Sequence, residues 1–297
     1  MLQNNYPRPR RPARVVVIGA GGFIAGAIVR ALAAEAVPVL PLGRPKLDLL
    51  SAESLRILKS EFRPDDVLVF ASAKAPCKNL AMLRENLLMA EPVCQALKDH
   101  PVAHVVYISS DAVYADSSEL LSEASSAEPA SYHGVMHLAR EIALKNEFKG
   151  PLAIVRPTLV YGYDDPHNGY GPNRFRRLAA AGMEIVLFGE GEERRDHVYV
   201  EDVAALVSLI VRHRSEGIAN AVSASVASFR ELAEFAASEF PPAVAIKGSP
   251  RIGPMPHDGY RPFKPSVALK AFPGFSFKGW REGLGAIHAR MNAERSK

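Results

Sequence analysis

Residues 14–32 join an apolar run, a cluster of glycines and a helical pattern, and this order restricts the fold more than any other feature. The β-branched run Val15–Ile18 is typical of a strand that is covered on both faces. Gly19 and Gly22 follow it, in the spacing Gly19-x-x-Gly22-x-x-Ala25. Glycines at the start of a helix let backbone N–H groups approach a pyrophosphate. The stretch predicts the start of a dinucleotide-binding fold; a tight turn that binds nothing is the alternative.

Apolar runs and helical patterns alternate beyond this stretch. Strands are expected at residues 37–42, 66–73, 104–110 and 152–158, and helices at 52–62, 80–97 and 132–148. Such alternation predicts an α/β fold, a Rossmann-type doubly wound parallel sheet, with ligands bound at the carboxyl ends of the strands. After about Gly162 the sequence loosens into loops, with short helices expected near 174–181, 203–212 and 229–240.

The chain accordingly divides into three parts. These are a basic flexible leader (1–13), a dinucleotide-binding core (14–162) and a smaller C-terminal substrate lobe (163–297), some segments of which return to the core. Prolines interrupt the arginines of the leader, so we expect it to stay mobile. No basic patch interleaved with aromatic residues follows it, and no nucleic-acid partner is expected.

Composition excludes several classes of protein. With 297 residues and 48% hydrophobic content, the chain can bury a large core. No apolar run approaches the roughly 20 residues that span a bilayer, and no apolar signal core is seen. We therefore expect a cytoplasmic protein with no membrane partner. Cys77 and Cys94 lack metal-ligand spacing, so reduced thiols and no metal site are expected.

Polar residues that could take part in catalysis follow one of the expected strands. Ser109, Ser110 and Asp111 follow the strand at 104–110, and Tyr132 opens the next helix. Taking hydride from an alcohol carbon requires the hydroxyl proton to leave, so a phenolate can serve as the base while a serine holds the oxygen. A free phenol has a pKa near 10, so a nearby positive charge must lower it. The alternative is that the serines end a strand and Tyr132 packs.

Taken together, the motifs resemble the extended short-chain dehydrogenase/reductase family of nucleotide-sugar epimerases, dehydratases and reductases. The resemblance runs from about Arg14 to about Leu284. It rests on the glycine turn, Phe70-Ala-Ser-Ala-Lys, Glu85-Asn86, Ser-Ser-Asp-Ala-Val-Tyr, Val155-Arg-Pro-Thr-Leu-Val-Tyr-Gly162 and the string from Leu187 to Asp202.

The resemblance implies roles for individual residues. Ser110 would orient the sugar oxygen and Tyr132 would be the acid/base. Arg195 would bind the substrate diphosphate, since a guanidinium binds phosphate oxygens in a bidentate manner. The expected cofactor contacts are Gly19, Gly22, Phe23, Ile24, Arg44, Asp48, Leu49, Ala71 and Tyr132, and the expected substrate contacts are Lys74, Asp111, Asn173, Arg195 and Arg251.

The catalytic motif departs from the family pattern. Where the family has Tyr-x-x-x-Lys, counting from Tyr132 gives Met136, and a thioether cannot supply the charge that lowers the tyrosine pKa. His137 is one residue further along, about 100° away around a helix, so we do not expect it to replace the lysine. Lys74 could project into the crevice. We therefore expect weakened or rearranged acid/base chemistry.

The cofactor choice depends on the end of the second strand. An NAD site usually has an acidic residue there, but this chain has Arg44, which could pair with a 2′-phosphate, so NADP is favoured over NAD. A solvent-facing Arg44 is the alternative. Asp48 resembles an acceptor for the adenine amino group.

These observations favour an NAD(P)-dependent epimerase or keto-reductase acting on a nucleotide-linked sugar. The dehydratases of the family have Thr-Asp-Glu where this chain has Ser110-Asp111-Ala112, which argues against dehydration. Two alternatives stay open: a non-catalytic NAD(P)-binding scaffold or sensor, and a reductase of a small carbonyl compound. The resemblance also makes a homodimer an expected state.

Overall fold

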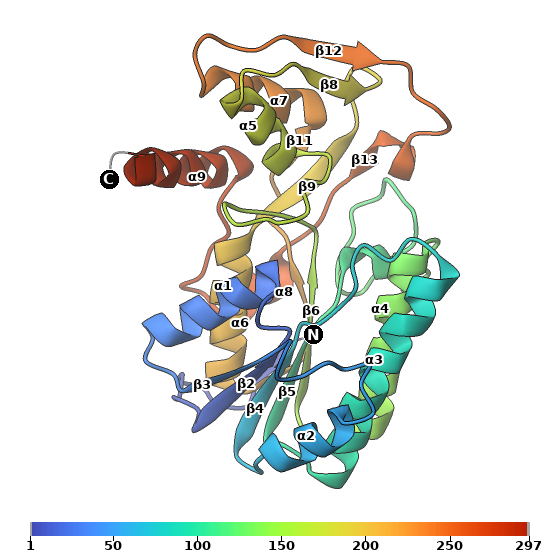
Figure 1. The fold of residues 1–297 in the computed structure, drawn as a ribbon, viewed down its shortest axis with the longest axis vertical. Helices are drawn as coiled ribbons and strands as arrows, with labels where there is room; N and C mark the ends of the chain where they lie inside the picture. The colour runs from blue at the N-terminus through green and yellow to red at the C-terminus, as the bar shows by residue number, and fades with distance from the viewer. Residues whose placement is uncertain (1, 296–297) are drawn as a thin grey trace.

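A seven-stranded sheet forms the centre of the computed structural model, which describes residues 2–295 (Figure 1). Its strands lie in the order β1 (Gln3–Asn4), β10 (Ser215–Ala221), β6 (Leu152–Pro157), β5 (His104–Ile108), β4 (Asp66–Phe70), β2 (Arg14–Ile18) and β3 (Val39–Leu42). Every neighbouring pair is parallel except β1 with β10. The parallel part starts at β2 and adds β3 on one side and β4, β5, β6 and β10 on the other, which confirms the predicted doubly wound sheet.

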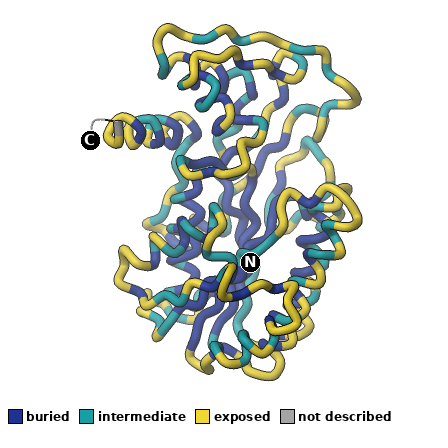
Figure 2. The backbone as a smooth tube through the Cα atoms, viewed as in Figure 1, coloured by how far each residue is buried: buried dark blue, intermediate teal, exposed yellow. Residues whose placement is uncertain are grey.

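Helices cover both faces of this sheet. Successive side chains of β2 face opposite layers: Val15 and Val17 pack in one core cluster, and Val16 and Ile18 in the other. The first cluster lies under α1 (Phe23–Ala34), α6 (Val200–His213) and α8 (Ser266–Ala271), and the second under α2 (Ser54–Glu61), α3 (Leu80–Asp99) and α4 (Tyr132–Glu147). The four central strands, β2, β4, β5 and β6, are accordingly buried along almost their whole length (Figure 2).

A smaller lobe lies beyond one end of the sheet (Figure 1). Its central strand is β9 (Arg194–Tyr199), which pairs with β7 (Leu159–Tyr161), β11 (Val226–Ser228) and β13 (Tyr260–Arg261). A second pair joins β8 (Ile185–Phe188) to β12 (Ile246–Ser249), and the helices are α5 (Pro172–Ala180), α7 (Phe229–Ser238) and α9 (Trp280–Arg295). Short 3-10 turns are η1 (Asp111–Val113) and η2 (Pro256–Gly259).

The lobe and the core exchange segments. Helix α6 and strand β10 come late in the sequence, but both belong to the core. Val203, Leu206 and Val207 of α6 are fully buried in the cluster that also contains the buried face of α1. The two units are therefore interleaved along the sequence.

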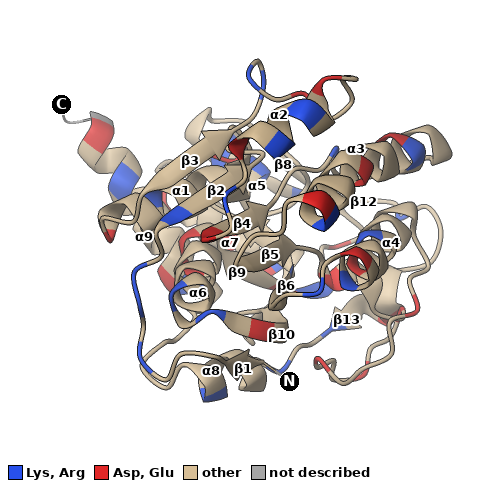
Figure 3. Cartoon of the chain, turned by 90° about the horizontal axis from the view of Figure 1, so that it is seen from below, with Lys and Arg blue, Asp and Glu red and all other residues tan. Residues whose placement is uncertain are grey.

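The basic leader, which the sequence predicts to stay mobile, makes several contacts with the core. Strand β1 pairs antiparallel with β10, and Asn4 donates a hydrogen bond to the Ala271 carbonyl oxygen at 3.0 Å. Further on, the backbone N–H groups of Tyr6 and Arg10 donate to carbonyl oxygens at the end of α6. Figure 3 shows β1 beside β10 and α8. The open edge of β10 supplies backbone partners that charge and proline content do not reveal.

Residues 2–295 include neither a membrane-spanning helix nor a cluster of metal-binding side chains. None of the helices there combines the length and the apolar composition that crossing a bilayer requires. No three His, Cys, Asp or Glu side chains in that range are grouped so that they could hold a metal ion. Cys77 and Cys94 are buried free thiols, and burial raises the pKa of Cys94 to about 11.

A buried histidine links β5 to β10. His104 is fully buried, and its Nε2 lies 2.7 Å from the Ser215 carbonyl oxygen. Burial lowers the pKa of His104 to about 4, so the ring is neutral in the folded protein over most of the acid range.

Acidification should therefore destabilise the protein through His104. The unfolded residue binds a proton near pH 6.5 and the folded one near pH 4, so stability falls as the pH is lowered between these values. The limiting slope for this residue is about 1.4 kcal/mol per pH unit. His104→Gln retains an N–H donor but cannot titrate. Urea unfolding at several pH values should show a shallower loss of stability in the variant; equal slopes would contradict a neutral folded His104.

Candidate functional site

The glycine turn after β2 is built to let another segment and a ligand approach. Gly19 has φ +93°, and a β-carbon there would lie 2.8 Å from the Cα atom of Ser72, in the loop after β4. Gly22 caps α1 without a side-chain hydrogen bond, and the first turn of that helix contains no acidic residue. The N-terminal N–H groups of α1 are thus left for an anion.

A groove of about 530 Å³ runs along this turn. Its lining includes the predicted cofactor residues Gly19, Gly22, Arg44, Asp48, Leu49 and Ala71. Arg44 is exposed and forms no ion pair or hydrogen bond with any residue in the range 2–295. Asp48 accepts a hydrogen bond from the Leu50 N–H through Oδ1, which leaves Oδ2 for a ligand. A dinucleotide fits this combination of a glycine turn, an open helix terminus and a groove.

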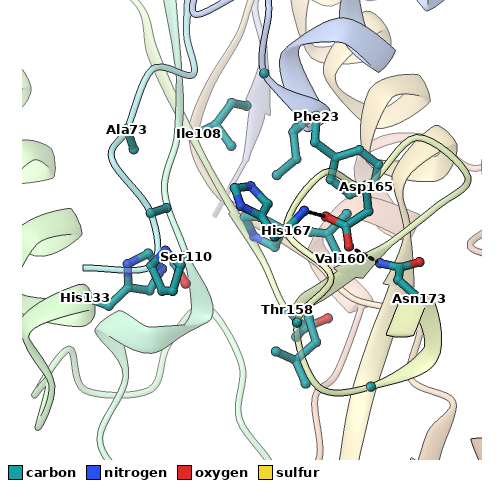
Figure 4. Close-up of a pocket in the computed structure, with 18 of the residues that line it drawn as sticks. Phe23, Ala73, Ile108, Ser110, His133, Thr158, Val160, Asp165, His167 and Asn173 are labelled. Carbon is teal, nitrogen blue, oxygen red and sulfur yellow. Dashed lines mark hydrogen bonds between the residues drawn. The ribbon is translucent and has the colours of Figure 1, made fainter. Parts of the chain in front are cut away.

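A second cavity of about 360 Å³ continues from the groove, and Gly22, Ala71, Ala73 and Ala75 line both. Its walls come from the core and from the lobe. Figure 4 shows Ser110 and His133 on one side, with Asp165 and Asn173 opposite them. Phe23 and Ile24, two predicted cofactor contacts, line this second cavity and not the groove.

Helix α4 turns a different face to the cavity than the sequence pattern indicated. Tyr132 is 46% exposed and lines neither compartment, while Met136 is completely buried and also lies outside both. His133 and His137 line the cavity instead, so His137 faces the crevice although it lies one residue beyond the position expected for the lysine. The four-residue spacing expected of the catalytic pair is present, displaced by one residue.

The position of Gly134 explains this rotation. A β-carbon on Gly134 would overlap the Ala112 carbonyl oxygen and also contact Pro129, so the helix meets η1 through a residue that has no side chain. Ser131 caps the helix by accepting a hydrogen bond from the Gly134 N–H. The glycine between two histidines was the sequence signal that could have located the cavity face.

Both histidines are held as neutral rings. His133 accepts a hydrogen bond from the Cys77 N–H through Nδ1 at 3.3 Å, and Nδ1 of His137 lies 2.8 Å from the Tyr107 hydroxyl oxygen. Burial lowers the pKa of both rings. A neutral ring that accepts at Nδ1 has its proton on Nε2; this assigns an Nε2–H donor to His133, and to His137 when the Tyr107 phenol donates to it.

Ser110 lies at the end of β5 and lines the cavity. Its hydroxyl oxygen accepts a hydrogen bond from the Ala112 N–H at 3.1 Å and lies 3.4 Å from the Asp111 carboxylate. Asp111 does not line the cavity; Arg261 of the lobe donates to its carboxylate at 3.2 Å and to its carbonyl oxygen at 3.0 Å. Asp111 is therefore placed to orient Ser110 rather than to touch a ligand.

The other predicted substrate residues are dispersed. Lys74 lines the dinucleotide groove but not the second cavity, and its ammonium group pairs with Glu85 at 2.6 Å. Asn173 lines the cavity, donating to Asp165 and accepting from the Gly162 N–H.

The two arginines expected at the diphosphate lie outside both compartments. Both pair with Glu193 instead: the nearest guanidinium nitrogen lies 3.2 Å from a carboxylate oxygen of Glu193 for Arg195 and 3.9 Å for Arg251. Among residues 2–295, none of those lining the second cavity is a lysine or arginine.

Sequence reasoning missed several residues of this cavity. Thr158, Asp165, His167 and His197 all line it. His197 lies within the motif string that ends at Asp202, but nothing in the string indicated which of its side chains face a ligand. Their convergence depends on how the lobe meets the core.

A dinucleotide groove that opens into a cavity with a serine and two neutral histidines defines an enzyme of the Rossmann type that uses a nicotinamide dinucleotide. Residues 15–223 match the model of the NAD-dependent epimerase/dehydratase family, and the chain belongs to that family.

Individual relatives are distant. The chain is 26% identical over 132 residues to an uncharacterised UDP-glucose epimerase of Bacillus subtilis, a match covering 42% of this chain and 40% of that protein. It is 25% identical over 270 residues to the dTDP-4-dehydro-6-deoxy-D-allose reductase of Streptomyces bikiniensis, covering 74% and 78%. The structure of Thermus thermophilus UDP-glucose 4-epimerase in complex with NAD is similar in fold, with a TM-score of 0.82 at 22% identity over 94% of this chain and 99% of that one.

Proposed function

We propose that the protein is an NAD(P)-dependent epimerase or ketoreductase of a nucleotide-linked sugar, in which His133 and Ser110 bind the reacting oxygen. The observation that carries the proposal is the placement of both side chains on the cavity that continues from the dinucleotide groove. The names of the relatives support the substrate class, since they describe a UDP-glucose epimerase and a reductase of a dTDP-linked sugar.

The chemistry differs from that of a tyrosine–lysine pair. A nicotinamide dinucleotide held in the groove would supply hydride exchange with the substrate carbon. Nε2–H of His133 donates a hydrogen bond to the carbonyl oxygen, and a neutral imidazole is able to polarise a carbonyl in this way. The Ser110 hydroxyl supplies a second hydrogen bond. Ser110 is buried and His133 is partly buried, and hydrogen bonds to a developing oxyanion are stronger in such surroundings than in water.

His137 does not restore the charge of the expected lysine, because burial lowers its pKa and keeps the ring neutral. Met136 is not the place where that charge belongs, since its side chain lies in the interior. The pair His133–His137 therefore favours hydrogen-bond stabilisation of the substrate oxygen over removal of its proton by a phenolate. The oxygen would take its proton from solvent water in the reducing direction and release it to water in the oxidising direction.

For the substrate diphosphate we propose Arg195 and Arg251. Both guanidinium groups lie near Glu193, so binding a diphosphate would exchange one anionic partner for another. The cavity itself, whose described lining contains no lysine or arginine, suits the uncharged part of the substrate. The same observation supports the second candidate, reduction of a small uncharged carbonyl compound.

The first test is turnover of a panel of UDP-, GDP-, dTDP- and CDP-sugars, including 4-keto forms, with NAD(H) and NADP(H), followed by proton NMR. We expect His133→Phe to lower kcat by about 100-fold, the range found for a positioned acid/base or oxyanion donor. Tyr132→Phe, an exposed neighbour on the same helix, should retain activity. Loss of turnover in Tyr132→Phe with full activity in His133→Phe would contradict the assignment of His133. If none of the sugars is turned over although the cofactor binds, a non-catalytic scaffold or sensor would be favoured.

NADP preference should depend on Arg44. A charge-assisted contact to the 2′-phosphate contributes about 1.5–3 kcal/mol, so Arg44→Ala should weaken NADPH binding at least tenfold. NADH lacks this phosphate, and its affinity should change little. Fluorescence titrations of both cofactors measure the difference; equal weakening of the two would show that Arg44 does not read the 2′-phosphate.

We also propose that α3 and α4 form a homodimer face. Exposed apolar residues cover these two neighbouring helices, among them Leu80, Leu87, Leu88, Val135 and Ile142. Such a face is suited to a second copy of itself. Light scattering after gel filtration should give a dimer mass for the wild type and a monomer mass for Leu87→Glu/Ile142→Glu. Leu120→Glu, exposed outside both helices, is the control; a monomeric wild type would contradict the proposal.

A further inference from the structure

His197, which belongs to the lining of the second cavity, has a buried ring nitrogen without a hydrogen-bond partner among residues 2–295. The residue lies on β9 and is 1% exposed. Nδ1 lies 3.1 Å from the Arg195 carbonyl oxygen, whereas Nε2 is buried and has no partner among residues 2–295. A carbonyl oxygen can only accept, so Nδ1 donates to it and Nε2 of the neutral ring has a free lone pair.

The surroundings keep His197 in this state. Its ring stands edge-on to Phe229 at 5.6 Å, and its strand pairs with neighbours on both sides. Burial, together with a smaller effect of the adjacent Arg195 charge, lowers the pKa of His197 to about 3. The ring therefore stays neutral at physiological pH and presents an acceptor, not a cation.

No other described side chain of the cavity lining has a buried polar atom without a partner. The Thr158 hydroxyl donates to Asp196. The side-chain amide of Asn173 donates to Asp165 through its nitrogen and accepts from the Gly162 N–H through its oxygen. A buried polar atom that is left unpaired is destabilising, and most such atoms in folded proteins have partners. The exception at His197 therefore points to a group that arrives with the ligand.

We propose that Nε2 of His197 accepts a hydrogen bond from a hydroxyl or N–H group of the substrate and so determines which substrates the cavity admits. This inference rests on the proposed function, because it concerns the same cavity. His133 offers a donor to the reacting oxygen and His197 an acceptor to a second substituent. A polyhydroxylated carbonyl compound such as a sugar satisfies both, whereas a simple ketone leaves the lone pair of His197 unpaired. Sites built to pair a substrate hydroxyl reject analogues that lack it.

Two substitutions separate the two ring nitrogens. His197→Asn retains a donor near the Nδ1 position and removes the Nε2 acceptor. His197→Gln retains an acceptor near Nε2 and removes the bond to the Arg195 carbonyl oxygen. For the panel sugar that is turned over, we expect kcat/KM to fall by about 10- to 100-fold in His197→Asn and to stay within about threefold in His197→Gln. Thermal unfolding should show the lower melting temperature for His197→Gln, because only this variant loses the hydrogen bond to the Arg195 carbonyl oxygen.

A measurement without turnover keeps the inference testable by itself. Nitrogen-15 NMR of the NADPH-loaded protein with labelled histidine should show an unprotonated Nε2 for His197, its signal identified by its loss in His197→Asn. UDP-glucose and dihydroxyacetone are the probes, one with a nucleotide and one without. A shift of the Nε2 signal with either probe supports the inference.

The outcomes distinguish the two proposals. If dihydroxyacetone shifts the signal while all nucleotide sugars are inert, the proposed substrate class fails and the role of His197 stands. If sugars are turned over but the signal stays fixed, or if Nε2 is protonated in the loaded protein, the role of His197 is overturned. Equal kcat/KM in the Asn variant and the wild type would overturn it as well.

Discussion

The site depends on one buried carboxylate, that of Glu141 on α4. It accepts a hydrogen bond from Ser109 at 2.6 Å and two from Arg156 of β6, at 2.9 and 2.6 Å. Burial alone would lower the pKa of Arg156, but the bonds to Glu141 more than offset this and raise it. A charge pair in the interior persists only when its hydrogen bonds are well made, so α4 has one favourable rotation against the sheet. His133, His137 and Glu141 share a helical face, and that rotation turns the histidines toward the cavity.

A second buried cation, Arg140 on α4, ties the helix to α3 and to the loop after β4. Arg140 is fully buried and donates to the backbone carbonyl oxygens of Ser72 and Asn86. The side-chain amide of Asn86 in turn accepts a hydrogen bond from the Lys74 N–H and donates one to the Lys74 carbonyl oxygen. The loop after β4 lines both the dinucleotide groove and the cavity, so these contacts set the distance between the cofactor and α4.

The lobe also reaches back to the catalytic strand. Arg261 of β13 is 1% exposed and spans from the lobe to Asp111, the residue beside Ser110. The same guanidinium lies 3.1 Å from the Ala115 carbonyl oxygen and 3.1 Å from Nδ1 of His257. The residue that is expected to hold the substrate oxygen is thus positioned partly by the lobe that is expected to hold the rest of the substrate.

The sequence by itself determined the α/β class, the doubly wound sheet and the glycine turn, because these follow from local patterns: β-branched runs, helical periodicity and glycines where the backbone needs them. Ser110 could be placed for the same reason, as it ends a buried strand. Only the tertiary structure decided which residues of α4 face the cavity, since a one-residue shift turns a helix by about 100° and the choice is made by Gly134, Arg140 and Glu141 against distant strands. The lone pair of His197 and the backbone contacts of the leader were equally invisible, because burial and hydrogen-bond partners far along the chain arise only when the core and the lobe pack together.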